Sequence, residues 1–222
     1  MPSFEGLFAI LLGALAAATA AGLFFALRRG GTSPAMAALG DGRFADALAA
    51  ARLGAGAGRD ELFAAAVAAK HLLRFDEARA LLDRLLGAAP DDGEARLEAA
   101  LVAAYTGDPA ADSGFQKAAA LRSDLGESIT LHRAWTALRQ GDRARARRLF
   151  DEVEAPLETK LRSDLGAGEP LFAEWFLHAA ALWAACGDAG RAAWAAREGR
   201  ASAPESRLPE IVLADFPQVP LQ

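Results

Sequence analysis

A short turn motif recurs through this chain at helix-pair intervals, and it constrains the fold more than any other feature of the sequence. Glycine followed by aspartate stands between apolar, helix-like runs. Gly107 lies midway between Leu73 and Gly141 in the sequence, so the same interval occurs twice in succession. Glycine ends a helix by taking a left-handed conformation, and aspartate caps the next one. The pattern predicts successive helix pairs, with turns at Gly40–Phe44, Leu73–Asp76, Gly107–Pro109, Gly141–Arg143 and Gly187–Ala189.

The composition agrees with an all-helical fold. Ala, Leu and Arg dominate, and these residues lose little side-chain freedom in a helix. The formal net charge of −5 argues against nucleic-acid binding, which needs a basic surface to displace counterions. A single cysteine, Cys186, excludes an internal disulfide. Its place before Gly187, at the end of an apolar run, predicts a small buried residue.

The helix-pair unit resembles the tetratricopeptide repeat, whose period of about 34 residues matches the interval between these turns. The resemblance covers residues 36–204, with residues 36–52 as a partial first unit, and is weakest over 93–123, where Asp112 replaces the expected alanine. It implies a stack of four to five helix pairs that share one continuous core. The positions that carry it are Ala65, Ala66, Phe75, Ala78 and Pro90; Ala134, Gly141, Ala146 and Phe150; and Trp183, Gly187, Ala192 and Pro204.

The first thirty residues predict a membrane anchor. Residues 6–27 are uncharged and long enough for a helix that spans a bilayer. Arg28 and Arg29 follow directly, which favours a cytoplasmic C-terminal domain at the bacterial inner membrane. A signal peptide, with a periplasmic domain, is the alternative. A linker at 30–35 separates anchor and repeats. Small residues four apart predict packing against another membrane helix: Gly13, Ala17, Ala18 and Gly22.

The resemblance also implies a protein-binding groove, because the first helices of such units line a concave face. The family's carboxylate-binding asparagine has no counterpart, since the chain contains no Asn. An apolar helix or extended segment is therefore the expected ligand. Tyr105 and Trp135 combine apolar area with a polar group and are the strongest contact candidates. The full stripe comprises Phe63, Val67, Lys70, His71, Leu97, Leu101, Tyr105, Leu131, Trp135 and Arg139, with Leu138 beside it.

Features of catalysis are sparse, and the sequence predicts neither a catalytic residue, a cofactor nor a metal. Glu174 and His178 share one helical face, but a metal site needs three or four ligands. The enzyme alternative would use His71, Tyr105 and Arg139. The densest basic cluster, from Arg139 to Arg148, offers either an acidic-partner surface or a solvated face neutralised by pairs such as Arg147–Asp151 and Arg148–Glu152.

Two irregularities complete the pattern. The hexapeptide LRSDLG occurs at 121–126 and 161–166. In the first copy, Asp124 and Glu127 have capping-box spacing and predict a helix start. The second lies in an insertion at about 154–169, where Leu157, Leu161 and Leu165 predict an extra amphipathic helix. The tail, residues 205–222, is predicted to cover the last unit through Ile211, Val212, Leu213 and Phe216.

These expectations combine into a non-enzymatic, membrane-anchored scaffold or accessory subunit. Its helical array would recruit or stabilise a protein partner in a membrane or envelope complex. An exported periplasmic binding module is the alternative, and an enzyme is the third reading.

Overall fold

A computed structural model describes residues 33–54, 56–163 and 169–216. Over these ranges the chain is helical and contains no strand, in agreement with the composition. The helices run over Pro34–Gly40 (α2), Phe44–Ala50 (α3), Arg59–His71 (α4), Phe75–Ala88 (α5), Gly93–Tyr105 (α6), Ala111–Leu121 (α7), Gly126–Arg139 (α8), Arg143–Leu161 (α9), Ala173–Ala185 (α10), Ala189–Ser202 (α11) and Pro209–Val212 (α12), with short 3-10 helices at Ser123–Leu125 (η1) and Pro170–Phe172 (η2).

The predicted turns share one backbone conformation. Gly42, Gly107, Gly141 and Gly187 all have positive φ angles, between 71° and 83°. Leu73 takes the equivalent place with φ 60°, a conformation that costs a residue with a Cβ about 1 kcal/mol. Asp142 and Asp188 then cap α9 and α11 by accepting the N–H groups of Arg145 and Arg191 at 2.9 Å. Turn position and helix start are therefore both encoded locally.

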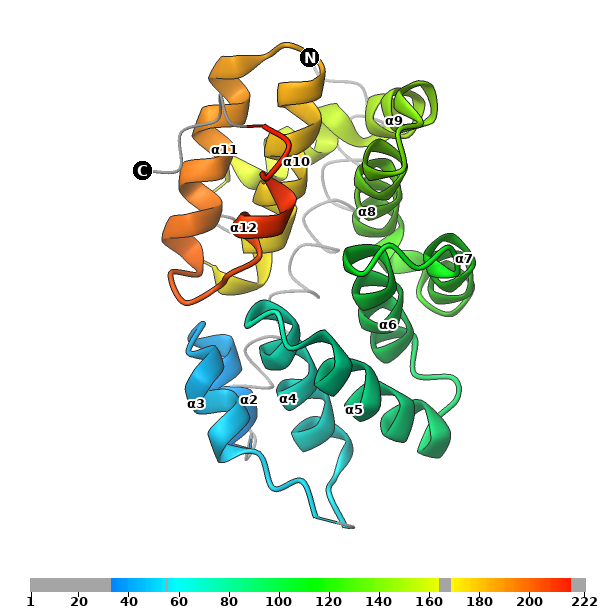
Figure 1. The fold of residues 1–222 in the computed structure, drawn as a ribbon, viewed down its shortest axis with the longest axis vertical. Coiled ribbons are helices and arrows are strands. Elements are labelled where there is room, and N and C mark those ends of the chain that lie inside the picture. The colour runs from blue at the N-terminus through cyan, green and yellow to red at the C-terminus, as the bar shows by residue number, and fades with distance from the viewer. Residues whose placement is uncertain (1–32, 55, 164–168, 217–222) are drawn as a thin grey trace, which may run out of the picture.

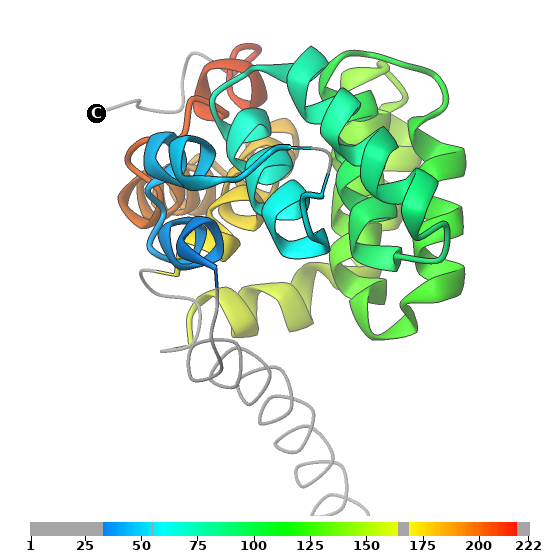
Figure 2. The same ribbon diagram turned by 90° about the horizontal axis from the view of Figure 1, so that it is seen from below.

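Consecutive helices pack as antiparallel pairs, namely α2/α3, α4/α5, α6/α7, α8/α9 and α10/α11. Figure 1 shows the pairs arranged in a closed array, in which the last pair lies beside the first. Figure 2 shows the same neighbours from below. The first helices α4, α6, α8 and α10 face the interior of this array. We call the interior side of α4, α6 and α8 the inner face, against which α10 packs.

Contacts between the first and last pairs close the array. Ala173 and Ala203 belong to the same buried cluster as Ala35, Phe44 and Val67. A Cβ on Gly42 would lie 3.1 Å from Pro170, so this turn and the start of the last pair approach closely. The Ala45 N–H also donates to the Glu205 carboxylate at 3.2 Å. Residues 169–216, here called the C-terminal unit, thus contact both the N-terminal pair and the inner face.

In the unit with the weakest repeat pattern, the small residues that allow α7 to cross α6 lie at positions other than 112. Asp112 does not enter the core; it accepts from Arg133 and Arg145 at 2.9 and 2.6 Å. Ala111 is fully buried instead, and Gly114 lies so close to α6 that an added Cβ would be 2.9 Å from the Ala100 Cβ. Small residues on either side of the expected alanine position therefore allow the close crossing.

Both predictions based on LRSDLG need correction. Helix α8 begins at Gly126 without a side-chain cap, and Asp124 instead pairs with Arg122 in the preceding 3-10 turn. Helix α9 continues through Pro156 to Leu161 as one helix of 19 residues, so no separate helix starts at the proline. Leu157 and Leu161 are buried on this extension. Leu165 lies outside the described residues.

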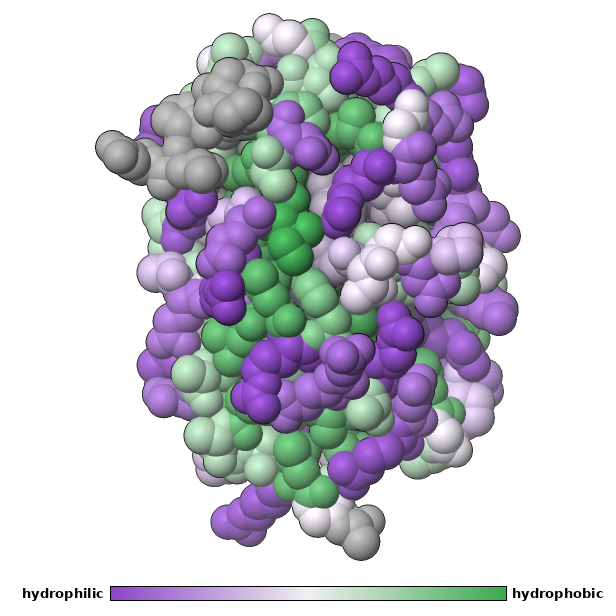
Figure 3. Space-filling view, viewed as in Figure 1, coloured by the Kyte–Doolittle hydropathy of each residue, from purple (hydrophilic) through white to green (hydrophobic). Residues whose placement is uncertain are grey.

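The C-terminal segment packs on the last pair through α12. Leu208, Val212 and Leu213 are each at most 2 % exposed and belong to the largest core cluster. In Figure 3 an apolar band runs down the middle of the face that carries α12, between hydrophilic flanks. Just before this short helix, the Leu208 N–H donates to Ser206 Oγ at 3.3 Å. The described part of the tail therefore covers the last unit, as its apolar residues predict.

The prediction of a transmembrane helix is corrected. In the part of the chain that the structure describes, no helix has both the length and the apolar character needed to cross a membrane. The predicted anchor (6–27), its small-residue rows (Gly13, Ala17, Ala18 and Gly22) and the first three residues of the linker (30–35) lie outside those ranges. The linker's last two residues, Pro34 and Ala35, already belong to α2. The localisation at the inner membrane, which depended on that anchor, is withdrawn with it.

Candidate functional site

The residues predicted to form an open groove lie together on the inner face, and most of them are covered. Phe63 is half-buried and Arg139 is exposed. The stripe is not open to solvent in this structure, since the other eight residues are each at most 8 % exposed: Val67, Lys70, His71, Leu97, Leu101, Tyr105, Leu131 and Trp135.

The C-terminal unit contacts this stripe at Lys70, His71, Tyr105 and Trp135 and adds polar groups of its own. Helix α10 packs against α8, and it brings Glu174 and His178 to the inner face. The ring of His178 stacks on Trp135, with centroids 4.1 Å apart and an interplanar angle of 9°. Arg139 lies over the indole of the same tryptophan, 5.4 Å from its ring centre. Trp135 is therefore a packing partner inside the chain rather than an exposed contact residue.

An ionic cluster lies at the centre of the inner face. Lys70 Nζ is 2.6 Å from Glu174 Oε2 and 2.7 Å from Glu98 Oε2, although Lys70 itself is only 1 % exposed. The Tyr105 hydroxyl donates to the other oxygen of Glu174. Buried ions require partners of this kind, because an unpaired charge loses its hydration without compensation. Glu174 thus joins α10 to α4 and α6 through both of its oxygens.

A chain of hydrogen bonds extends the cluster into α8. The Tyr105 hydroxyl donates its hydrogen bond to Glu174, so its oxygen accepts a hydrogen bond from His178 Nε2 at 2.9 Å. A neutral His178 then has a bare Nδ1, which accepts from His132 Nδ1–H at 2.8 Å. His132 Nε2 accepts from the Ser128 hydroxyl at 3.1 Å. All donors therefore point towards the Glu174 carboxylate. We call this set the Glu174 network; it comprises Lys70, Glu98, Tyr105, Ser128, His132, Glu174 and His178.

Burial and charge act together on the pKa values of the network. Burial lowers the pKa of His132 to about 4 and moves that of His178 well below its usual value, so both rings are neutral at pH 7. Burial would also raise the pKa of Glu174, but the adjacent Lys70 charge outweighs it and holds that pKa low. For Glu98, burial wins over Lys70 and raises the pKa. Lys70 stays charged, because the two carboxylates outweigh its burial and raise its pKa.

The network links α4, α6, α8 and α10 through side chains that are mostly buried. Its members are buried, except for Glu98, whose side chain is 16 % exposed. Glu174 and His178, which share one helical face, both turn to Tyr105. Among the described residues, no group of three or more His, Cys, Asp or Glu side chains is placed to hold a metal. The third histidine, His71, contacts Ser206 and Phe44 and lies outside this hydrogen-bond chain.

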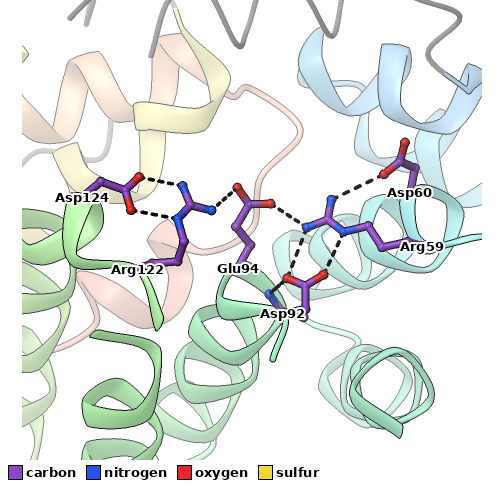
Figure 4. A network of polar contacts seen from close by, with 7 residues as sticks. Arg59, Asp60, Asp92, Glu94, Arg122 and Asp124 are labelled. Carbon is purple, nitrogen blue, oxygen red and sulfur yellow. Dashed lines mark hydrogen bonds and ion pairs between the residues drawn. The ribbon is translucent and has the colours of Figure 1, made fainter. Parts of the chain in front are cut away.

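Charged clusters on the outside are largely self-neutralised. Figure 4 shows Arg59 between Asp92 and Glu94, and Arg122 between Glu94 and Asp124. Exposed pairs of this kind contribute little to stability individually. In the basic cluster at 139–148, three of the five arginines are engaged: Arg139 with Trp135 and the Tyr105 carbonyl, Arg145 with Asp112, and Arg147 with Asp151. Within the described ranges neither Arg143 nor Arg148 forms an ion pair, so the suggested Arg148–Glu152 pair is not formed.

The prediction of a buried Cys186 is wrong. The thiol is exposed at the end of α10, where Arg147 Nη1 lies 2.9 Å from its sulfur. The residue follows the last helical turn and points away from the apolar interior, which hydropathy along the sequence does not reveal.

A shallow apolar hollow is a surface feature that the sequence analysis did not suggest. It has a volume of about 210 Å³ and lies between α5, α6 and α7, at the close crossing of Gly114 and Ala100. Arg96 and Lys117 line it, and neither forms an ion pair with a described residue, although Arg96 donates to the Pro90 carbonyl. The other lining residues are Leu86, Ala99, Ala100, Ala103, Ala110, Ser113 and Gly114.

Local sequence patterns do not reveal the role of Glu98 or the pairing of Lys70 with Glu174. One signal was available, since Lys70 ends an otherwise apolar run from Leu62 to Ala69 on α4. A charge in such a run needs a buried partner. Its partner lies 104 residues away, beyond any local pattern.

No family model matches the chain, and neither the curated proteins nor the solved structures contain a match to it.

Proposed function

We propose that this chain is a non-enzymatic protein-binding module, a scaffold or accessory subunit built from tetratricopeptide-like helix pairs. The family likeness is supported by five helix pairs, in each of which an equivalent left-handed turn joins the two helices. The burial of the Glu174 network favours binding over catalysis, because all of its members except Glu98 are covered by the chain itself.

The proposal rests on the hollow between α5, α6 and α7. This hollow is open to solvent, whereas the inner face is mostly covered. Its volume of about 210 Å³ is below the range of about 300–1,000 Å³ that is usual for small-molecule pockets. A side chain projecting from another protein fits such a hollow better than a free metabolite does. Four of the nine lining residues are alanine and a fifth is Leu86, so the contact favours an apolar group.

Arg96 and Lys117 define the charge of the partner. Two cations that form no ion pair with a described residue complement carboxylates on the opposing surface, which steers association and fixes orientation. The proposed partner is therefore a protein segment with an apolar side chain flanked by Asp or Glu. The chain as a whole is acidic, with a net charge of −5, so this basic site stands out against its surroundings.

The test is affinity capture with the full chain, using a charge-reversed hollow and a matched control. Arg96→Glu with Lys117→Glu reverses the site. Arg143→Glu with Arg148→Glu makes the same change in charge at arginines that pair with no described carboxylate. The proposal expects a partner that binds the unmodified chain and the control but not the hollow variant. It also expects that binding is lost when the acidic residues of the partner's contact segment are changed to amides. A partner retained equally by all three proteins contradicts the proposed site.

A further inference from the structure

All three histidines of the chain lie at one interface. The sequence contains only three, and each is at most 4 % exposed. His178 belongs to the C-terminal unit, while His132 on α8 and His71 at the end of α4 face that unit from the other side. Each of the three therefore lies where residues 169–216 meet the inner face.

His71 holds the C-terminal segment through two contacts and the N-terminal pair through a third. Its Nδ1 lies 2.9 Å from Ser206 Oγ, and its carbonyl accepts the Arg207 N–H at 2.8 Å. Its ring stacks on Phe44 with centroids 4.1 Å apart. One residue therefore links α4, the N-terminal pair and the segment before α12.

His132 and His178 meet at a contact that tolerates a limited number of protons. The two Nδ1 atoms are 2.8 Å apart, so one must donate and the other accept. A first added proton can be accommodated on His178 Nδ1 if His132 changes tautomer. The bare His132 Nδ1 then accepts from His178, and the Ser128 hydroxyl turns to accept from His132 Nε2–H. When both rings are charged, both Nδ1 atoms carry hydrogens, and the bond between α8 and α10 is lost.

The surrounding charges decide how well the interface can hold such protons. Lys70 and Arg139 are cationic and oppose further positive charge, while Glu98 and Glu174 favour it; Tyr105 is neutral. Lys70 neutralises Glu174 at 2.6 Å and also contacts Glu98, so little anionic charge is left for two imidazolium rings. Burial removes water that would otherwise stabilise them, and it lowers the pKa of His71 to about 3.

We propose that the C-terminal unit is a proton-sensitive closure of the array: acidification releases it from the inner face while the other helix pairs stay folded. Release uncovers the apolar stripe formed by Val67, Leu97, Leu101, Leu131 and Trp135. The three histidines act as the sensors, because each bridges the released unit and the part that remains. This closure is independent of the partner site in the hollow, which involves only α5, α6 and α7.

Hydrogen exchange on the full chain, read by mass spectrometry between pH 7.5 and pH 4.5 and corrected for intrinsic exchange, tests the closure. The expected result is a loss of protection in α10–α12 at a pH where α6 and α7 remain protected. Simultaneous loss of protection in every helix would show global acid unfolding and overturn the proposal. So would unchanged protection of α10–α12 over the whole range.

Two variants test whether the histidines, rather than titrating groups elsewhere, set the pH at which the C-terminal unit is released. His132→Gln retains a donor and an acceptor but cannot take up a proton, so the midpoint of release should move down by about half a pH unit. Asp112→Asn removes a titrating group from the α7–α8–α9 contacts and should leave that midpoint unchanged. If His132→Gln fails to fold by circular dichroism, His71→Gln takes its place with the same expectation. A midpoint unaffected by either histidine substitution contradicts the assigned sensors.

Discussion

The imidazole rings of His132 and His178 meet through their Nδ1 atoms, 2.8 Å apart and with planes at 86°. Only one of these atoms can carry the hydrogen when both rings are neutral. The donor is fixed at the other end of the hydrogen-bond series. The Tyr105 hydroxyl donates a hydrogen bond to Glu174, so the Tyr105 oxygen accepts from His178 Nε2–H.

This relationship predicts the tautomer of each ring. His178 should be protonated on Nε2 and His132 on Nδ1 at pH 7.5. Nitrogen chemical shifts of the imidazoles, measured by NMR on labelled protein, distinguish the two forms. The opposite assignment for His178 would mean that the Tyr105 hydroxyl does not donate to Glu174, and the proposed direction of the hydrogen bonds would then be reversed.

The depressed histidine pKa values predict a loss of stability towards acid. An unfolded histidine titrates near pH 6.5, whereas folded His132 titrates at about 4 and His71 at about 3. Below about pH 6.5 the unfolded chain therefore binds more protons, and the folded state loses stability until its own pKa values are reached. Between pH 7 and pH 5 each of these histidines should cost about 2 kcal/mol of unfolding free energy.

Two carboxyls modify this trend in opposite senses. The raised pKa of Glu98 offsets part of the loss, because folded Glu98 takes up its proton first as the pH falls. The depressed pKa of Glu174 adds to the loss, mainly below about pH 4.5. Urea unfolding at half-unit pH steps measures the sum. A free energy that is constant from pH 7 to pH 5 would show that the histidines are not buried as neutral rings.

Removal of both ions of the Lys70–Glu174 pair should cost less than the two single removals added together. Lys70→Met leaves Glu98 and Glu174 buried together without a cation, and should cost about 3–5 kcal/mol. Glu174→Gln in the same chain removes the carboxylate nearest the missing charge. The double variant should therefore be less destabilised than the sum of the single variants, by about 1–3 kcal/mol in a double-mutant cycle. Additive losses would mean that Lys70 and Glu174 do not interact.

A turn glycine and a helix glycine predict opposite effects for the same Gly→Ala substitution. Gly107 has φ +74° and open space around it, so Gly107→Ala should destabilise the fold by about 1 kcal/mol through backbone strain alone. Gly87 also has open space around it but lies within α5, where Gly87→Ala should stabilise the helix by about 0.5 kcal/mol. Thermal unfolding of both variants measures the signs. Equal effects would contradict the left-handed turn at Gly107.

The sequence predicts local features well because each depends on a few neighbouring residues. The turn at Gly141, with Asp142 as the following cap, is visible in the residues themselves. Leu73 could be aligned with the turn glycines from the period alone. The membrane prediction for residues 6–27 also came from local hydropathy, but those residues lie outside the structure and no described helix could span a bilayer.

Long-range closure of the array explains what local patterns could not predict. The sequence pattern placed Lys70 in an open groove, yet it is buried against Glu174, which is 104 residues away. Trp135 was similarly predicted to contact a partner and instead stacks on His178. On α7, the shift that replaces Asp112 with Ala111 and Gly114 at the helix crossing depends on the shape of α6. None of these contacts leaves a periodic trace in the sequence.

The separation between α3 and α11 tests the closed array most directly. Spin labels at Ala49 and Arg197, both exposed, can be introduced after Cys186→Ser removes the native thiol. Electron–electron double resonance at pH 7.5 should give one short, narrow distance distribution, because the first and last helix pairs are in contact. A long or broad distribution at that pH would show an open array, and would contradict the closure by the C-terminal unit on which this account depends.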